Sequence, residues 1–146
     1  MEGEEEVVGV DASVVAKWFV EEEHTDEALE LRDDYVARLV DIASPELLPF
    51  EVLNALRYNP NIGENQLKRA AGALDGYSLW LFPLTGELAE RCLENALRHG
   101  ISVYDSAYLS LGEVRGILVY TADRKLIDKA GDRTLRHISD YRRRAP

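Results

Sequence analysis

The sequence predicts an α/β fold, a three-layer α/β/α sandwich around a mainly parallel central sheet of about five strands. Short apolar runs alternate with longer segments whose apolar residues recur at helical spacing, the pattern of strand–helix–strand units. The run at 117–120 is wholly apolar, as expected for a strand covered on both faces. At 146 residues the chain fits one domain, which would bury roughly 70% of the surface of its unfolded form.

In the first half of the chain each predicted element has a local signal. Residues 7–10 form a short buried strand, and a helix begins at Ser13. A second helix begins at Thr25, has acidic residues in its first turn and ends near Asp41. The remaining elements of this half are a short strand at 42–43, a helix with Pro49 in its first turn, and a chain break at 59–63.

The second half continues the same alternation. A helix from about 64 to 77 leads into a strand at 78–82, which Pro83 ends. Thr85 caps the next helix, and Gly100 closes it. The remaining elements are strands at 101–104, 117–120 and 135–138, a helix from Asp105 to about Glu113, and a short helix from Asp123.

Composition limits the possible functions. No apolar stretch approaches the roughly 20 residues of a membrane-spanning helix, and residues 1–6 are acidic where a signal peptide is basic. We therefore expect a cytoplasmic protein with no membrane segment. The ordered core is expected over about 7–138, between an acidic N-terminal tail and a basic C-terminal tail. Cys92 is the only cysteine, which excludes disulfides and thiolate metal sites within one chain.

The charge distribution is uneven. The net charge of −10 argues against binding nucleic acid through bulk electrostatics. However, residues 1–50 carry 15 acids against 3 Lys or Arg, whereas residues 115–146 carry 9 Lys or Arg against 4 acids. The basic end could therefore touch phosphate. A solvated surface with a disordered tail at 142–144 is an equally weighted alternative.

Four carboxylates stand at the edges of apolar runs, where burial makes an acid costly: Asp11, Glu51, Asp105 and Asp123. Three of them directly follow predicted strands, and ligands of such sheets bind beyond the carboxyl ends of the strands. Glu51 enters from the first turn of a helix, where the helix dipole favours a carboxylate. Gathered acids repel one another unless they share protons or bind a cation, and oxygen ligands suit Mg2+ or Mn2+. Helix capping is the alternative for each acid alone, above all for Asp105 and Asp123.

The sequence around these acids resembles a known family. The motifs are Asp11-Ala12-Ser13, the Pro49-Phe50-Glu51 segment, Tyr104-Asp105-Ser106 and Thr121-Ala122-Asp123-Arg124. In order, spacing and context they resemble the PIN-domain ribonucleases, specifically the small VapC toxins of prokaryotic toxin–antitoxin pairs, from about Val7 to Ile138. The resemblance implies a single PIN domain over residues 1–146, a Mg2+ or Mn2+ site and endonucleolytic cleavage of RNA. It also implies a cognate antitoxin and a homodimer.

The same resemblance assigns roles to individual residues. It implies that Asp11 and Asp105 are the main metal ligands, directly or through water. Glu51 and Asp123 complete the pocket, by holding metal or orienting the attacking water. Outside these acids, hydroxyls support the carboxylates or cap locally, and basic side chains meet the RNA backbone or merely face solvent. The hydroxyls are those of Ser13 and Thr121, and the basic side chains are those of Arg124 and Lys125.

The sequence gives weaker indications of a role in RNA binding or catalysis for the aromatic and histidine residues. Tyr104 and Tyr108 flank Asp105 and are candidates for stacking on bases, although core packing is the favoured interpretation for Tyr104. The three histidines share no metal-ligand spacing, which disfavours a histidine-based mechanism: His24, His99 and His137.

Two other functions remain open from the sequence. The first is a non-catalytic metal- or RNA-binding regulatory module that keeps the PIN-like fold and pocket. The second is a phosphatase with an aspartate nucleophile. Such phosphatases usually have a second Asp two residues after the first, and Ser13 stands there, so this option is disfavoured.

Overall fold

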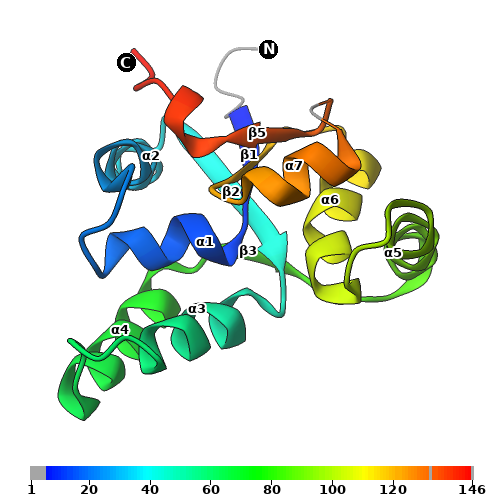
Figure 1. Ribbon diagram of the computed structural model, residues 1–146. Coiled ribbons are helices and arrows are strands. Elements are labelled where there is room, and N and C mark those ends of the chain that lie inside the picture. Colours follow the sequence, from blue (N-terminus) through cyan, green and yellow to red (C-terminus); the bar gives the residue numbers. More distant parts are fainter. Residues whose placement is uncertain (1–5, 132, 146) are drawn as a thin grey trace.

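The sheet of this protein has five strands in the order β3-β2-β1-β4-β5, and every pair of neighbouring strands is parallel. We describe it from a computed structural model that places residues 6–131 and 133–145. Helices cover both faces of the sheet (Figure 1), so the predicted α/β/α fold is confirmed. The strands are β1 (Glu6–Val10), β2 (Val40–Pro45), β3 (Trp80–Phe82), β4 (Val119–Thr121) and β5 (Leu135–His137).

The helices follow the predicted alternation, but the cap of α5 and the end of α2 differ from their predictions. Thr85 stands at the N-cap of α5, but its side chain makes no capping hydrogen bond. The second helix ends at Val36 rather than near Asp41, because residues 37–39 turn and Val40 already pairs with Glu6 of β1. The helices are α1 (Ala12–Val15), η1 (Ala16–Trp18), α2 (Thr25–Val36), α3 (Leu48–Arg57), α4 (Glu64–Tyr77), α5 (Gly86–His99), α6 (Val103–Arg115), α7 (Arg124–Ala130) and η2 (Ile138–Asp140).

The core has two parts, one on each face of the sheet. Successive side chains of a strand point to opposite faces. Val8 and Val10 of β1 therefore join the main core beneath α1 and α2, while Val7 packs against a smaller cluster that includes Leu88 of α5 and Leu111 of α6. Figure 1 shows the same division, with α1 and α2 on one side of the sheet and α5 and α6 on the other.

Helix α6 lies unusually close to the sheet because Gly112 faces it. A Cβ at Gly112 would stand 2.4 Å from Thr134 Cγ2 and 2.7 Å from Val119 Cγ2. On the sheet side, a Cβ at Gly9 would stand 2.8 Å from the same Val119 methyl group. Because Gly9 and Gly112 have no side chains, β1 and α6 can both pack directly against Val119 of β4. This contact fixes the position of α6, whose first turn carries Asp105.

The strand predicted at 101–104 is wrong, because these residues begin α6. Ser102 is the N-cap and its hydroxyl oxygen accepts a hydrogen bond from the Asp105 N–H at 3.0 Å. Val103 and Tyr104 lie in the first turn and are 41% and 63% exposed. A short apolar run is compatible with a strand or a helix, and the Ser-x-x-Asp capping pattern was the signal for a helix. Asp105 therefore stands in a first helical turn and follows no strand.

The C-terminal segment packs back on the beginning of β1 and on α2. Tyr141 is fully buried, and its hydroxyl donates to Asp34 Oδ2 at 2.5 Å. The backbone N–H of Arg144 donates to the same oxygen at 2.9 Å, and its guanidinium binds both carboxylate oxygens of Glu6 at 2.8 and 3.0 Å. Arg143 lies 3.9 Å from Asp33. The sequence suggested either a solvated, disordered tail or a segment that contacts phosphate. These residues instead contact other residues of the same chain.

None of the helices in the described ranges is both long enough and apolar enough to cross a membrane.

Candidate active site

The strand order places a candidate site at the carboxyl end of β1. Chain connections leave β1 toward β2 on one side and reach β4 on the other, so the order of the strands reverses there. Crevices at such a reversal are the usual ligand sites of parallel sheets. Asp11 directly follows β1, and Asp123 comes two residues after Thr121, the last residue of β4. Two of the four predicted acids therefore stand at the reversal point.

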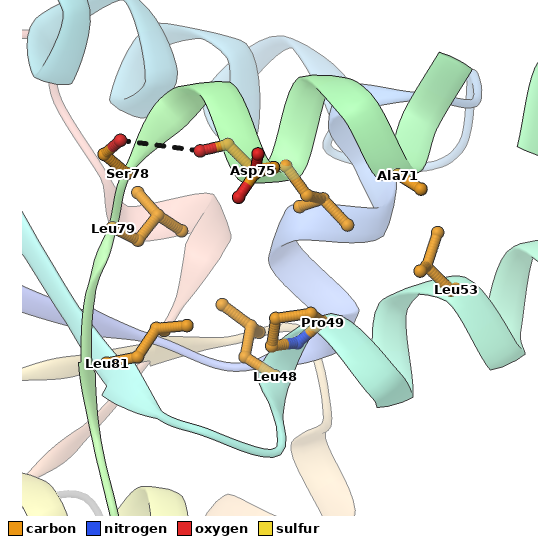
Figure 2. A pocket seen from close by; sticks show the side chains of 9 residues that line it. Leu48, Pro49, Leu53, Ala71, Asp75, Ser78, Leu79 and Leu81 are labelled. Carbon is orange, nitrogen blue, oxygen red and sulfur yellow. Dashed lines mark hydrogen bonds between the residues drawn. The ribbon is translucent and has the colours of Figure 1, made fainter. Parts of the chain in front are cut away.

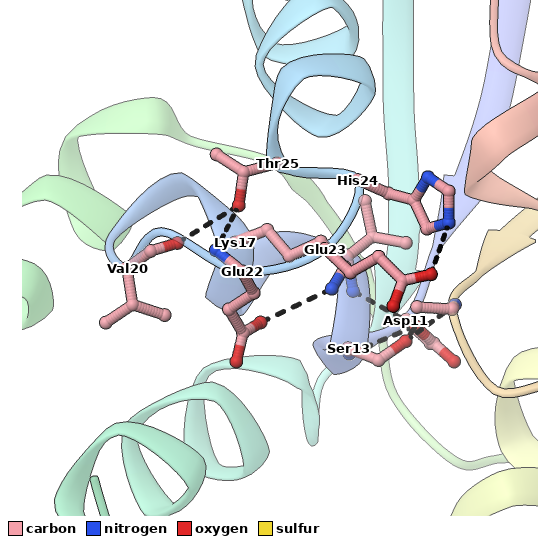
Figure 3. Close-up of polar contacts among 10 residues, drawn as sticks. Asp11, Ser13, Lys17, Val20, Glu22, Glu23, His24 and Thr25 are labelled. Atoms are coloured by element: carbon pink, nitrogen blue, oxygen red, sulfur yellow. Dashed lines mark hydrogen bonds and ion pairs between the residues drawn. The ribbon is translucent and has the colours of Figure 1, made fainter. Parts of the chain in front are cut away.

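Asp11 is buried, with 6% of its surface exposed, and accepts four hydrogen bonds. Figure 3 shows its position next to Ser13. Its Oδ1 accepts from the backbone N–H groups of Ser13 at 3.1 Å and Val14 at 3.4 Å, and from the Ser13 hydroxyl at 2.5 Å. Its Oδ2 accepts from the Thr121 hydroxyl at 2.5 Å. The two backbone bonds make Asp11 the N-cap of α1, a position that the sequence suggested for Ser13.

The two hydroxyls join the ends of β1 and β4. The oxygen of Ser13 accepts from the Ala122 N–H at 2.9 Å, and that of Thr121 accepts from the Asp123 N–H at 3.0 Å. Since a backbone N–H points at each hydroxyl oxygen, the hydroxyl proton is turned toward Asp11. Donors of this kind stabilise an ionised carboxylate and fix its orientation.

Burial nevertheless dominates the ionisation of Asp11. Loss of solvent raises the pKa of this carboxyl from its ordinary value of 3.8 to about 6, against the opposing effect of the hydroxyl and backbone donors. No ion pair reaches Asp11 from the residues that the structure describes. A buried carboxylate without a cationic partner is costly, and a bound cation would remove that cost.

We expect the stability of the metal-free protein to depend on Asp11 ionisation. Because its folded pKa lies above the unfolded value, the favourable contribution is present below about pH 3.8 and is lost as the pH rises through 6. At pH 8 the ionised side chain costs about 3 kcal/mol. Asp11→Asn cannot ionise, so its free energy of unfolding should gain about 3 kcal/mol relative to wild type between pH 4 and pH 8. Urea unfolding in EDTA measures this difference, and a pH-independent difference would contradict it.

Glu51 is held by a tyrosine that the sequence did not identify as its partner. Tyr108 of α6 is 2% exposed and its hydroxyl donates to Glu51 Oε1 at 2.6 Å. Burial, this hydrogen bond and the charges of Glu51, Asp11 and Asp105 all raise the pKa of Tyr108. Tyr108 is therefore in contact with Glu51 and within electrostatic range of Asp11 and Asp105. Spacing was the available signal, because residues three apart on a helix, here Asp105 and Tyr108, share a face.

Tyr104 is exposed and Tyr108 is buried, the opposite of what the sequence suggested. Core packing was the favoured interpretation for Tyr104, but this side chain is 63% exposed, whereas Tyr108 is buried. The reason is the early start of α6, which turns Tyr104 to solvent in the first turn and Tyr108 inward one turn later.

Asp105 and Asp123 lie close enough to repel. Burial and the charge of Asp123 raise the pKa of Asp105, and the charge of Lys129 opposes this shift. Asp123 also caps α7, since its Oδ1 accepts from the Leu126 N–H at 3.1 Å. Asp105 does not cap α6, because Ser102 does. A capping carboxylate keeps free lone pairs, so capping does not exclude a second role for Asp11 or Asp123.

The donor chemistry fits a hard divalent cation. Within residues 6–131 and 133–145, no group of three or more His, Cys, Asp or Glu side chains is close enough together to hold a metal ion. Mg2+ does not require such a cage, because it usually binds one or two carboxylates and completes its shell with water and substrate phosphate. One or two of the site carboxylates could supply the protein part of such an oxygen shell.

The basic and histidine side chains of α7, η1 and the start of α2 differ in exposure and in their partners. Arg124 and Lys125 are exposed on the first turn of α7, and no described residue forms an ion pair with either. Lys17 is buried, and its ammonium group lies 3.4 Å from the Glu22 carboxylate (Figure 3). His24 binds carboxylates, with Nδ1 3.2 Å from Glu27, and its ring meets that of His137 at 5.2 Å.

An apolar hollow of about 300 Å3 lies elsewhere, between α3, α4 and the segment that enters β3. Figure 2 shows its lining, which consists mostly of leucine side chains such as Leu48, Leu53 and Leu81. Asp75 is the only acid in the lining, and none of the four site carboxylates reaches it. It therefore offers packing surface rather than chemistry.

The five-stranded parallel sheet with helices on both faces is the fold of a PIN domain. The family model described as PIN domain matches residues 8–132 of this chain, and the chain belongs to that family. Within the family it is a homologue of the VapC-type ribonuclease toxins. It is 31% identical over 126 residues to Ribonuclease VapC3 of Pyrobaculum aerophilum, which covers 82% of this chain and 92% of the relative.

Solved structures show the same fold at low sequence identity. A chain of a toxin–antitoxin complex from Klebsiella pneumoniae aligns with a TM-score of 0.67 and 17% identity, over 90% of this chain and 97% of that one. VapC20 of Mycobacterium tuberculosis, described as a sarcin–ricin loop cleaving toxin, aligns with a TM-score of 0.64 and 16% identity, over 95% and 99% of the two chains.

Proposed function

We propose that the protein is a single PIN domain acting as a Mg2+- or Mn2+-dependent endoribonuclease, the toxin of a VapBC-type toxin–antitoxin system. The observation that carries the proposal is Asp11, a buried carboxylate that two hydroxyls orient and that has no cationic partner among the residues the structure describes. The similarity to Ribonuclease VapC3 supports RNA as the substrate.

The residues of the site have distinct tasks in this proposal. Asp11 and Asp105 hold the cation, and Asp123 completes its surroundings. A divalent cation supplies charge neutralisation at phosphate and lowers the pKa of a bound water. Glu51 is kept in place by the Tyr108 hydroxyl, so its second oxygen is available to orient the attacking water or accept its proton. Ser13 and Thr121 keep Asp11 oriented.

Metal removal tests the proposal directly. We expect the purified protein to cut single-stranded RNA in Mg2+ or Mn2+ and to lose this activity in excess EDTA, with recovery when Mg2+ is restored. The measurement is the disappearance of end-labelled RNA and the appearance of internal fragments. Cation binding by calorimetry without RNA turnover would instead favour the non-catalytic regulatory module.

Arg124 and Lys125 are proposed to contact RNA phosphate, because they are exposed beside Asp123 and free of ion pairs among the described residues. We also infer a homodimer, a cytoplasmic location and a cognate antitoxin. The similarity to a chain of a toxin–antitoxin complex is consistent with the last of these.

The toxin role predicts a phenotype. Expression in a bacterial host is expected to arrest growth, and coexpression of the cognate antitoxin, to be sought in a short gene adjoining this one, is expected to relieve the arrest. Colony counts after induction measure both effects, with Asp11→Asn as the inactive control. Unimpaired growth with the wild-type chain at high expression would contradict a toxin role and leave housekeeping RNA processing.

A further inference from the structure

A second hollow, of about 560 Å3, opens next to the carboxylates. It lies between the first turns of α3 and the first turn of α6 and is lined by Leu47, Phe50, Glu51, Asn54 and Tyr104. Glu51 is one of the four site acids, and Tyr104 directly precedes another, Asp105. The hollow therefore adjoins the candidate site through Glu51.

Two aromatic rings in this hollow face solvent. Phe50 is 80% exposed and Tyr104 is 63% exposed. Neither ring contacts another aromatic ring or a cation in the described part of the chain. Solvent-facing rings beside a nuclease site are suited to unpaired bases, because every base has a face that stacks on an aromatic side chain.

Asn54 adds a polar group to the same lining. It stands four residues after Phe50 on α3, so the two side chains share a helix face. Asn54 is exposed, and its side-chain amide makes no hydrogen bond with the described residues. An amide offers both a donor and an acceptor, which can pair with the edge of a base.

Electrostatics favours a base over the phosphate backbone at this position. The chain carries a net charge of −10, and Glu51 itself belongs to the lining. The lining contains no lysine or arginine. A phosphate group would meet repulsion here, whereas a neutral base would not.

We propose that this hollow binds an unpaired RNA base next to the scissile phosphate, with the base against Phe50 and Tyr104 and its edge toward Asn54. The inference rests on the proposed ribonuclease function and deepens it by assigning part of the substrate specificity. Phe50 and Tyr104 provide stacking, and Asn54 distinguishes among bases. The substrate is therefore single-stranded or unpaired at that nucleotide.

Abasic substitution tests the assignment. A short single-stranded RNA is prepared with an abasic nucleotide at each position around the cleavage site, and kcat/KM is measured for every version. With the wild-type protein, one position should show a loss of about 10-fold or more, in the range that base–aromatic stacking gives. In Phe50→Ala and Tyr104→Ala the penalty at that position should fall nearly to unity, while Tyr104→Phe should keep it.

Tyr58→Ala is the matched control, because Tyr58 is an exposed aromatic residue immediately after α3 that does not line the hollow. This variant should keep the wild-type penalty. Penalties that are unchanged in Phe50→Ala and Tyr104→Ala, or the absence of any sensitive position, would overturn the inference while leaving the ribonuclease assignment intact. Circular dichroism checks that the variants are folded.

Two further results are decisive. If the wild-type protein cuts no RNA, the proposed function fails, and base binding in the hollow is then measured by fluorescence anisotropy with the same RNAs. Equal RNA affinities of wild type and Phe50→Ala overturn the base-binding assignment. A loss of affinity in Phe50→Ala that is confined to RNAs with an intact base at the sensitive position supports it. If the variants instead keep base discrimination but lose affinity for the cognate antitoxin, the hollow is a protein-binding surface and the base assignment is overturned.

Discussion

Replacing Asp11 or Asp105 by asparagine is expected to lower the rate of metal-dependent RNA cleavage by at least about 100-fold. Each change removes one negative charge from a site that must hold a divalent cation. Stabilisation of the transition state by such a cation amounts to several kcal/mol, and each 1.4 kcal/mol corresponds to about a factor of 10 in rate. Initial rates on single-stranded RNA at saturating Mg2+ measure the loss.

Asp75→Asn provides the matched control for this experiment. Asp75 is an exposed aspartate on α4 outside the candidate site, so the same chemical change there should leave the rate within about twofold of wild type. Both site variants should remain folded, because asparagine preserves the shape of the side chain. Undiminished metal-dependent cutting by both Asp11→Asn and Asp105→Asn would refute the assignment of the site.

Replacing Tyr141 by alanine is expected to lower the free energy of unfolding by about 3–5 kcal/mol. The ring is fully buried and meets the ring of Tyr120 edge-on at 5.3 Å. Its removal leaves a cavity and takes one hydrogen bond from Asp34, which is only 2% exposed. Urea unfolding, followed by circular dichroism at constant pH, measures the change.

Two variants separate the contributions to this effect. Tyr141→Phe removes only the hydroxyl, so it should cost about 1–2 kcal/mol, since Arg144 still donates to Asp34. Tyr104→Ala removes an exposed ring of the same type and should change stability by less than about 0.5 kcal/mol. A loss below 1 kcal/mol in Tyr141→Ala would mean that the C-terminal segment contributes little to the folded state.

Much of this fold follows from local sequence. The range of α4 agrees with its prediction, and the strands at 7–10, 117–120 and 135–138 were found to within about two residues, because buried parallel strands are short and apolar. The predictions failed where local and tertiary preferences compete. The end of α2 is set by pairing of Val40 with β1, and the run at 101–104 suits a strand until the Ser102 cap is considered.

The site was less accessible to sequence reasoning than the fold. The positions of Asp11 and Asp123 could be inferred from strand ends, and that of Glu51 from the first turn of α3, whereas Asp105 stands in the first turn of α6 and not at the predicted strand end. Their partners could not, because Thr121 is 110 residues from Asp11, and Tyr108 is 57 residues from Glu51. Such hydrogen bonds depend on which strands become neighbours, and no periodicity encodes that. Metal binding by these acids stays a prediction.

The attachment of Arg144 to Glu6 affects how RNA binding should respond to salt. Glu6 begins β1, so this arginine lies ~16 Å from Asp11 along the strand, with its charge already neutralised. The basic side chains on α7 near the acids are Arg124, Lys125 and Lys129. If about three phosphates are neutralised, few counterions are released, and the logarithm of the RNA-binding constant falls by only about 2 for a tenfold increase in salt. Recognition by this acidic protein would then persist at ionic strengths that dissociate strongly basic RNA-binding proteins.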